Sequence, residues 1–267
     1  MSAPANESLL NRLRGGWNSS EDLTENLRRL KRNARAICQE AAATGTTSEK
    51  LVQNTITQIG DTLRNLTVSE SPCSSYMIWI DGVGAWQLSI GQSFTIGAPR
   101  FEKKSADIAL LANISRQHAA LHHNAENWQV TADQPTTVSG RTVTKSIGIR
   151  SGDELCLADR VRLRFRVPSV LSSSAVIDFE SNHRPTHTVD GIILMVDHCL
   201  FGPRRDHHVC CPEWPDVMVL YHQDGQLRCR SAFAMKVNGK TVSDFSPLQH
   251  GSIVEAEDLR FRIEEIR

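Results

Sequence analysis

Two apolar stripes with heptad spacing occupy the first quarter of the chain. Ser19 can cap the first helix, and the segment around Gly45 separates it from the second. The apolar positions step by four and three residues: Leu23, Leu27, Leu30, Ala34, Ile37 and Ala41, then Val52, Ile56, Ile59, Leu63 and Leu66. This spacing predicts an antiparallel α-helical hairpin as a first region, residues 1–69.

A helical hairpin of this size buries too little apolar surface to be stable alone. Each apolar stripe therefore needs a partner, which is the other helix, the next domain or a second subunit. We expect docking or self-association, as in a homo-oligomer, through the helices within residues 20–68.

The pattern changes to short strands beyond the polar segment 69–75, which contains Pro72. In residues 161–167, VRLRFRV, apolar side chains alternate with three arginines. A period of two with one charged face is typical of a strand that is half-buried in a sheet. Many such segments, separated by turns rich in Gly, Asp and Asn, predict a mainly β fold of antiparallel sandwiches.

The second half of this β region repeats the first in the same order. The matching segments are TTVSGRTV (136–143) with MKVNGKTV (235–242), Gly152 with Gly251, LRFR (163–166) with LRFR (259–262), and FTIGAPR (94–100) with CLFGPRR (199–205). Four matches at a nearly constant offset predict two tandem copies of one β-sandwich, residues 76–168 and 175–267.

Composition narrows the classes of partner. Thirty Lys and Arg residues balance thirty Asp and Glu residues, so we expect no nucleic-acid binding. No apolar segment approaches the ~20 residues of a membrane helix, and the N-terminal residues lack the layout of a secretory signal. The seven cysteines contain no CxxC pair, which fits a reducing compartment. We therefore expect a cytoplasmic protein without a membrane partner.

The order of motifs within the first copy resembles the forkhead-associated (FHA) domain. The elements that carry the resemblance are Ile96-Gly97 with Arg100, Ser115-Arg116-Gln117-His118, Val138-Ser139-Gly140, and the later turn Ser151-Gly152-Asp153. The resemblance implies a β-sandwich whose loops at one end bind phosphothreonine peptides. It further implies a module for protein–protein interaction in signalling, with no enzymatic activity and no cofactor.

The resemblance also implies the site residues. Ser115 would donate to a phosphate oxygen, Arg100 would supply positive charge, and Arg116 would extend the basic rim. Ser139, followed by Gly140, occupies the position where the family usually has an Asn that grips the peptide backbone. Gly97 and His118 would brace the loop from within.

Two departures from the family pattern leave a second interpretation open. The family has an Arg directly after the glycine, where this chain has Ala98, and Ser139 offers fewer donors than Asn. The alternative is a scaffold that keeps the FHA fold but interacts without phosphate. The second copy has PDVM (215–218) where the first has SRQH, which predicts a degenerate copy without phosphate binding.

Two further interpretations have weaker support. Ser115 and His118 as a nucleophile and base would need a third orienting group and an oxyanion hole, and no G-x-S-x-G elbow is present. The run 207–211, HHVCC, could bind a metal, but adjacent residues on a strand point to opposite faces. We therefore expect neither a catalytic nor a metal site.

Overall fold

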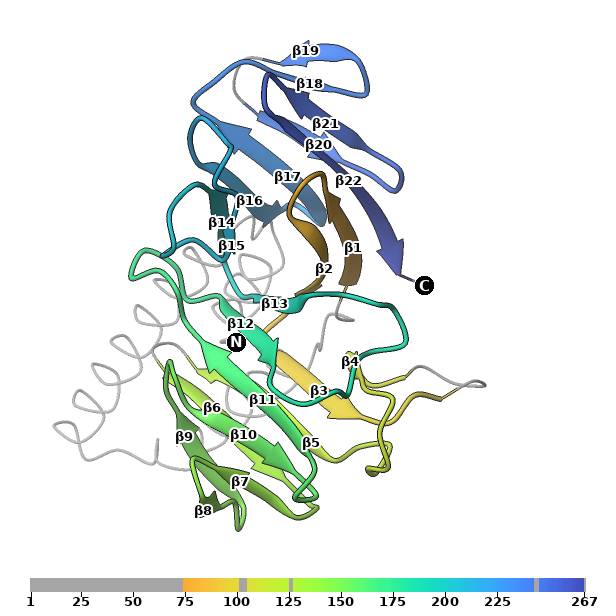
Figure 1. The fold of residues 1–267 in the computed structure, drawn as a ribbon, viewed down its shortest axis with the longest axis vertical. Coiled ribbons are helices and arrows are strands. Elements are labelled where there is room, and N and C mark those ends of the chain that lie inside the picture. Colours follow the sequence, from red (N-terminus) through yellow and green to blue (C-terminus); the bar gives the residue numbers. More distant parts are fainter. Residues whose placement is uncertain (1–73, 101–104, 125–126, 243–244, 267) are drawn as a thin grey trace, which may run out of the picture. The chain divides into compact units, whose positions relative to one another are not determined.

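The computed structural model describes residues 74–100, 105–124, 127–242 and 245–266, and all of its regular elements are β-strands (Figure 1). The hairpin predicted for residues 1–69 lies outside the described residues. No helix in the described ranges is long and apolar enough to cross a membrane.

The strands form one twelve-stranded sheet and two five-stranded sheets. The large sheet has the order β19-β18-β21-β22-β1-β2-β13-β12-β11-β10-β7-β8. Its strands are β1 (Ser74–Ile80), β2 (Gly84–Ile90), β7 (Thr136–Val138), β8 (Arg141–Thr142), β10 (Glu154–Leu157), β11 (Val161–Arg166), β12 (Ala175–Phe179), β13 (Gly191–Met195), β18 (Met235–Val237), β19 (Lys240–Val242), β21 (Ile253–Ala256) and β22 (Leu259–Ile266).

The two small sheets have the orders β4-β3-β5-β6-β9 and β15-β14-β16-β17-β20. Their strands are β3 (Ser93–Gly97), β4 (Ile108–Ala109), β5 (Ala119–Asn124), β6 (Asn127–Ala132) and β9 (Ser146–Ile149), then β14 (His198–Gly202), β15 (Val209–Cys210), β16 (Met218–Gln223), β17 (Gln226–Ser231) and β20 (Phe245–Leu248). Each strand of one small sheet has a counterpart in the other, in the same position. The mainly β fold predicted from the alternating pattern is therefore confirmed.

Strand pairing joins the two halves of the chain in one continuous sheet. β1 pairs with β22, the last strand, whereas β12 pairs with β11. β2 and β13 then meet as parallel neighbours in the middle of the sheet. The predicted ranges 76–168 and 175–267 each form one continuous stretch of chain. In the structure, however, the first strand of each range pairs with the last strand of the other range. That the two ranges are duplicated copies stays a prediction.

We call β3 to β13 the first sandwich, and β14 to β22 with β1 and β2 the second sandwich. The central strand β13 contributes side chains to the cores of both sandwiches. Ile192 and Leu194 pack in the core of the first sandwich, and Ile193 and Met195 pack in that of the second. Because successive side chains of a strand point to opposite faces, the two small sheets lie on opposite faces of the large sheet. The unbroken apolar run of β13 is thus a strand buried on both sides.

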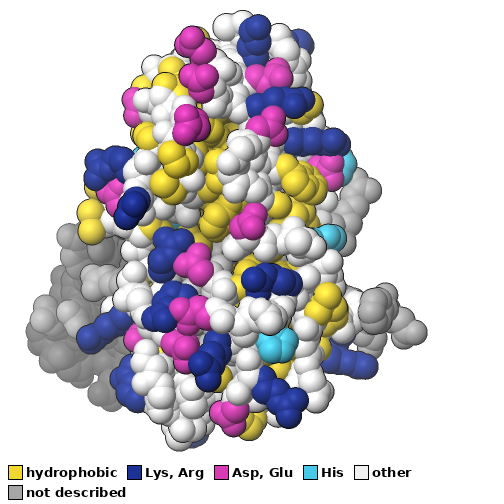
Figure 2. All heavy atoms as spheres, viewed as in Figure 1, with side chains coloured by type: hydrophobic (Ala, Val, Ile, Leu, Met, Phe, Trp, Pro, Cys, Tyr) yellow, Lys and Arg dark blue, Asp and Glu magenta, His cyan; other side chains and the backbone are white. Residues whose placement is uncertain are grey.

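Ion pairs connect the neighbouring strands β11 and β12. Val161, Leu163 and Phe165 of VRLRFRV are buried as predicted, and its arginines face outward. Arg166 pairs with Asp178 of β12, and Arg164 pairs with Glu180, the residue that follows β12. Figure 2 shows the resulting mixture of basic and acidic side chains over β11 and β12. The arginine face is therefore largely neutralised by acids from the adjoining strand.

Candidate functional site

Three loops of the first sandwich meet at one end. β3 and β5 pair antiparallel with Ile96 opposite Ala119, and β5 and β6 pair with Ala119 opposite Ala132. The end of β3, the start of β5 and the end of β6 are therefore neighbours. The loops next to these strand ends have the described residues 98–100, 110–118 and 133–135. We call these three segments together the loop end.

Hydrogen bonds connect these three segments. The Ala98 N–H donates to the Ser115 carbonyl at 3.0 Å, which ties the first segment to the second. The Ser115 N–H donates to His118 Nδ1 at 3.3 Å, and His118 Nε2 donates to the Pro135 carbonyl at 3.1 Å. His118 is only 3% exposed. Its ring therefore links the second segment to the third from within.

Gly97 allows a close backbone approach at this end. A Cβ atom at Gly97 would lie 2.1 Å from the Arg116 carbonyl oxygen and 2.9 Å from the Ser115 carbonyl oxygen. Both are backbone atoms of the neighbouring loop, so the loop would have to move. The absence of a side chain here thus sets the position of Ser115 and Arg116.

The polar side chains predicted for the site remain available at the surface of this braced turn. Arg116 is exposed, and Ser115 and Arg100 are partly exposed. Within the described residues, none of these three side chains has a hydrogen-bond or ion-pair partner. The backbone at Arg100 is itself tied down, since its N–H donates to Ser105 Oγ at 2.6 Å. A hydroxyl and two guanidinium groups on rigid backbone form an arrangement suited to an oxyanion.

The structure does not bring Ser139 and Gly140 to the loop end. β7 starts there, with Thr136 opposite Leu157, and runs away from it, with Val138 opposite Leu155. Ser139 and Gly140, with φ of 46° and 78°, then form the tight turn between β7 and β8. The side chain of Ser139 donates to Asp153 Oδ1 at 2.7 Å. A hairpin-turn dipeptide at the far end of β7 therefore stands about 10 Å or more from the loop end.

Gln134 is an exposed amide side chain that the motif comparison missed. It lies at the loop end between Asp133 and Pro135, outside the segments that the repeat pattern matches. The Pro135 carbonyl next to it accepts from both His118 and the Ala158 N–H. The register of β6 against β5 locates Gln134, and no short sequence motif marks it.

The corresponding end of the second sandwich is built differently. A Cβ at Gly202 would lie 2.9 Å from His207 Nδ1, and the Arg204 N–H donates to that nitrogen at 3.3 Å. The guanidinium of Arg204 makes two hydrogen bonds with Asp206. These contacts lower the pKa of Asp206. By the strand register, the place of His118 is taken by Val217, one residue earlier than the sequence comparison with PDVM put it.

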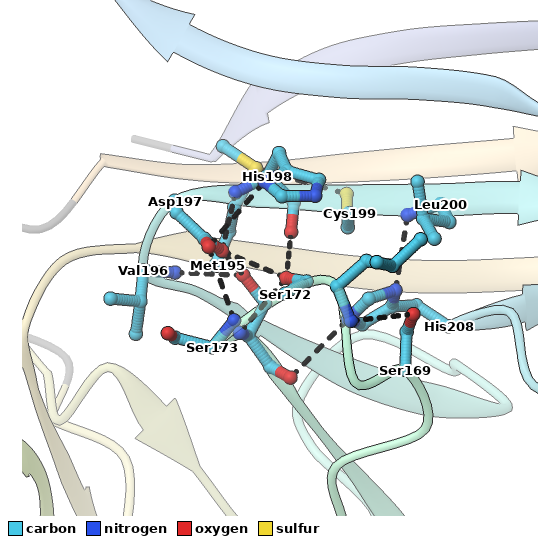
Figure 3. Close-up of polar contacts among 12 residues, drawn as sticks. Ser169, Ser172, Ser173, Met195, Val196, Asp197, His198, Cys199, Leu200 and His208 are labelled. Carbon is cyan, nitrogen blue, oxygen red and sulfur yellow. Dashed lines mark hydrogen bonds and ion pairs between the residues drawn. The ribbon is translucent and has the colours of Figure 1, made fainter. Parts of the chain in front are cut away.

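A second polar cluster joins the segment before β12 to the turn between β13 and β14 (Figure 3). Ser172 and Ser174 donate to Asp197 Oδ1 at 2.8 and 2.9 Å, and the Ser173 N–H donates to Oδ2. Burial opposes ionisation of Asp197, but hydrogen bonds from His198 and these serines outweigh it and hold the pKa of Asp197 far below its usual range. The hydroxyls donate to the carboxylate and not to an imidazole, so the cluster is not arranged to activate a nucleophile.

The two histidines of HHVCC point to different partners. His207 Nδ1 accepts from the Arg204 N–H, whereas His208 Nδ1 accepts from the Leu200 N–H at 3.0 Å. Among the residues that the structure describes, no group of three or more His, Cys, Asp or Glu side chains is placed to hold a metal ion.

No family model and no curated protein matches the chain. One similar solved structure is described as "Structural and functional analysis of phosphothreonine-dependent FHA domain interactions"; it is 22% identical, with 32% of this chain and 88% of that chain covered and a TM-score of 0.23. Another is Mycobacterium tuberculosis EmbR in complex with low affinity phosphopeptide, 18% identical, with 43% of this chain and 30% of that chain covered and a TM-score of 0.24. At these TM-scores the likeness does not indicate a function. A functional proposal therefore depends on the geometry of the loop end.

Proposed function

We propose that the loop end of the first sandwich binds a phosphothreonine in a partner protein. The chain is then an FHA-like phosphopeptide-recognition module that mediates protein–protein interaction in signalling, and not an enzyme. The observation that carries the proposal is the set of Ser115, Arg100 and Arg116, whose side chains have no partner within the described residues, on a backbone held by Gly97 and His118. A hydroxyl donor and two guanidinium groups suit the charge and the acceptor oxygens of a phosphate group.

A phosphothreonine brings about −1.5 to −2 charges and three strong acceptor oxygens. The Ser115 hydroxyl donates to one oxygen, while Arg100 and Arg116 neutralise the charge. The exposed amide of Gln134 takes the role of holding the peptide backbone that the motif comparison gave to Ser139, because Gln134 lies at the same end as Ser115. Ser139 and Gly140 are then turn residues without ligand contact.

The wider proposal has three parts. The ranges 76–168 and 175–267 are tandem copies of one duplicated unit, of which the second has lost phosphate binding. The helices predicted within residues 20–68 support self-association, and the protein is cytoplasmic.

A test uses the full chain, because the two sandwiches share strands that are buried on both faces. Isothermal calorimetry with a phosphothreonine peptide library and its unphosphorylated counterpart should give heat only with the phosphorylated library. The double variant Arg100→Ala, Ser115→Ala should abolish this heat, and Arg204→Ala in the second sandwich is the matched control that should keep it. Binding that ignores the phosphate, or that survives the double variant, contradicts the proposal.

A phosphate-independent scaffold is the second candidate. Val170 and Leu171 stand 102% and 74% exposed between the buried residues Ser169 and Ser172. An apolar pair on an anchored loop favours contacts that need no phosphate. Under this alternative, Val170→Ser with Leu171→Ser would weaken partner binding while Arg100→Ala would not.

A further inference from the structure

A hollow of about 520 Å³ opens at the opposite end of β7 from the loop end, on the first sandwich. Its lining residues are Ser139, Arg141, Gly148, Arg150 and Asp153. It contains none of the residues to which we assign phosphate binding. A ligand could therefore bind here whether or not the loop end binds phosphate. The charges that line it favour an anionic ligand.

The acidic residue in the hollow is already satisfied from within. Asp153 accepts from the Ser139 hydroxyl and from the Arg150 N–H, both at 2.7 Å. These are neutral donors, so the carboxylate uses neither guanidinium group in a hydrogen bond. Burial opposes its ionisation, but these hydrogen bonds and the charges of Arg141 and Arg150 lower the pKa of Asp153. Asp153 thus acts as a fixed part of the turn.

The two arginines are therefore free to meet a ligand. Both side chains are exposed, and in the described ranges neither makes a hydrogen bond or ion pair with its guanidinium group. They come from different elements, Arg141 from β8 and Arg150 from the end of β9, and face one hollow. Two guanidinium groups against one internally satisfied carboxylate leave an excess of positive charge that suits an oxyanion.

Gly148 keeps the hollow open. A Cβ atom there would meet only the Trp128 carbonyl oxygen, at 4.0 Å, which is an ordinary contact. A larger side chain at this position would therefore extend into the hollow without straining the backbone. Any other residue would fill space that the glycine leaves to a ligand.

The strands beside the hollow favour an extended peptide over a small anion. β9 is the last strand of its five-stranded sheet, and β8 is the last strand of the twelve-stranded sheet, in the described part of the chain. An edge strand offers unpaired backbone N–H and C=O groups to an added strand, whose side chains then give specificity. We propose that this hollow binds an extended acidic segment of a partner protein, with its carboxylates on Arg141 and Arg150.

The test titrates the full chain with an unphosphorylated peptide in which Glu alternates with Thr. The same peptide with Gln for Glu and inorganic phosphate alone serve as comparison ligands. Arg141→Gln with Arg150→Gln should weaken binding of the Glu peptide roughly 25-fold, at about fivefold for each exposed guanidinium. Gly148→Leu should block binding by filling the hollow, and rising salt should weaken binding in the unmodified chain.

Control variants that remove positive charge elsewhere distinguish binding in the hollow from nonspecific electrostatic attraction of the Glu peptide. Lys236→Gln with Lys240→Gln removes two exposed charges from the equivalent hairpin of the second sandwich, and Arg100→Ala removes one from the loop end. Both variants should retain binding of the Glu peptide. The proposal is overturned if these controls weaken binding as much as the hollow variants do, if the Gln peptide binds equally well, or if inorganic phosphate binds as tightly as the peptide.

Discussion

The loop ends of the two sandwiches are built from similar residues that are used differently. In each, a glycine ends a strand and an imidazole accepts a backbone N–H nearby. In the first sandwich, His118 braces the turn that presents Ser115, and the nearby arginines are unpaired within the described residues. In the second, His207 comes from the loop directly after the strand, and Arg204 is paired with Asp206. The glycine and the imidazole thus support the fold at each end, whereas the proposed ligand binding depends on leaving charge unpaired.

The largest expected effect comes from filling the glycine contact. Gly97→Ala places a methyl group 2.1 Å from a backbone carbonyl oxygen, so the loop must shift. We expect this to reduce the free energy of unfolding by about 3 kcal/mol, measured by urea denaturation, and to abolish phosphopeptide binding. Gly202→Ala is the matched change, because its methyl group would meet a movable His207 side chain and the Val217 backbone at 2.9 to 3.0 Å. Equal losses for both variants would show that the two ends do not differ in rigidity.

Removing the imidazole of His118 should separate stability from binding. His118→Ala leaves the Ser115 N–H without its acceptor and should cost about 2 kcal/mol of unfolding free energy. Phosphopeptide affinity should fall as well, because Ser115 is no longer held. His207→Ala should also destabilise the chain while leaving affinity unchanged, and a loss of affinity there would contradict the assignment of binding to the first sandwich.

The pH dependence should be governed in part by His208 in the second sandwich. Burial lowers the pKa of His208 to about 4, from an ordinary value near 6.5. The unfolded chain therefore binds more protons than the folded chain in this window, so stability falls as pH falls from about 7 toward 4. The contribution from pH 7 to pH 5 is about 2 kcal/mol. His198 acts in the opposite sense, because its hydrogen bond with Asp197 raises its pKa.

NMR titration of the imidazole resonances measures the two histidines separately. His208 should titrate well below pH 6 and His198 above its ordinary value. A His208 resonance that titrates near pH 6.5 would refute the buried, neutral ring.

The smallest effect tests whether the second loop end can be opened. Asp206→Asn removes the carboxylate that pairs with Arg204, in an ion pair whose Arg204 and Asp206 side chains are 72% and 46% exposed. Stability should not change measurably, because exposed ion pairs contribute little. The Arg204 Nε–H resonance should then shift on addition of inorganic phosphate, and an identical shift in the unmodified chain would show that Asp206 does not block this guanidinium.

The alternating pattern was sufficient to predict the strands, but not their partners. Val161, Leu163 and Phe165 lie on the buried face as the pattern predicts. The repeat could not indicate that β1 pairs with β22 and β12 with β11, because β1 and β12 are equivalent strands and either pairing satisfies the same pattern. The run Ile192–Val196 was the available signal, since a strand without alternation is typical of burial on both faces.

The sequence predicted the types of residue in the site better than it predicted their positions, because the positions depend on how the strands pair. The resemblance to the FHA family indicated Gly97, Ser115 and His118, and the structure brings these three residues together in one loop system. Ser139 was assigned to the same end because its place before a glycine resembled a family motif, whereas its positive φ makes it a hairpin-turn residue. Gln134 escaped notice because only the pairing of β5 with β6 brings it to the loop end.

The most direct test of the central claim is an NMR titration of the full, ¹⁵N-labelled chain with a phosphothreonine peptide and its unphosphorylated form. We predict that the amide resonances of Ala98, Ser115 and Arg116 shift with the phosphorylated peptide, while those of Arg204 and Val217 do not. Equal shifts with the unphosphorylated peptide, or shifts at Arg204 and Val217 in place of Ser115, would contradict the account.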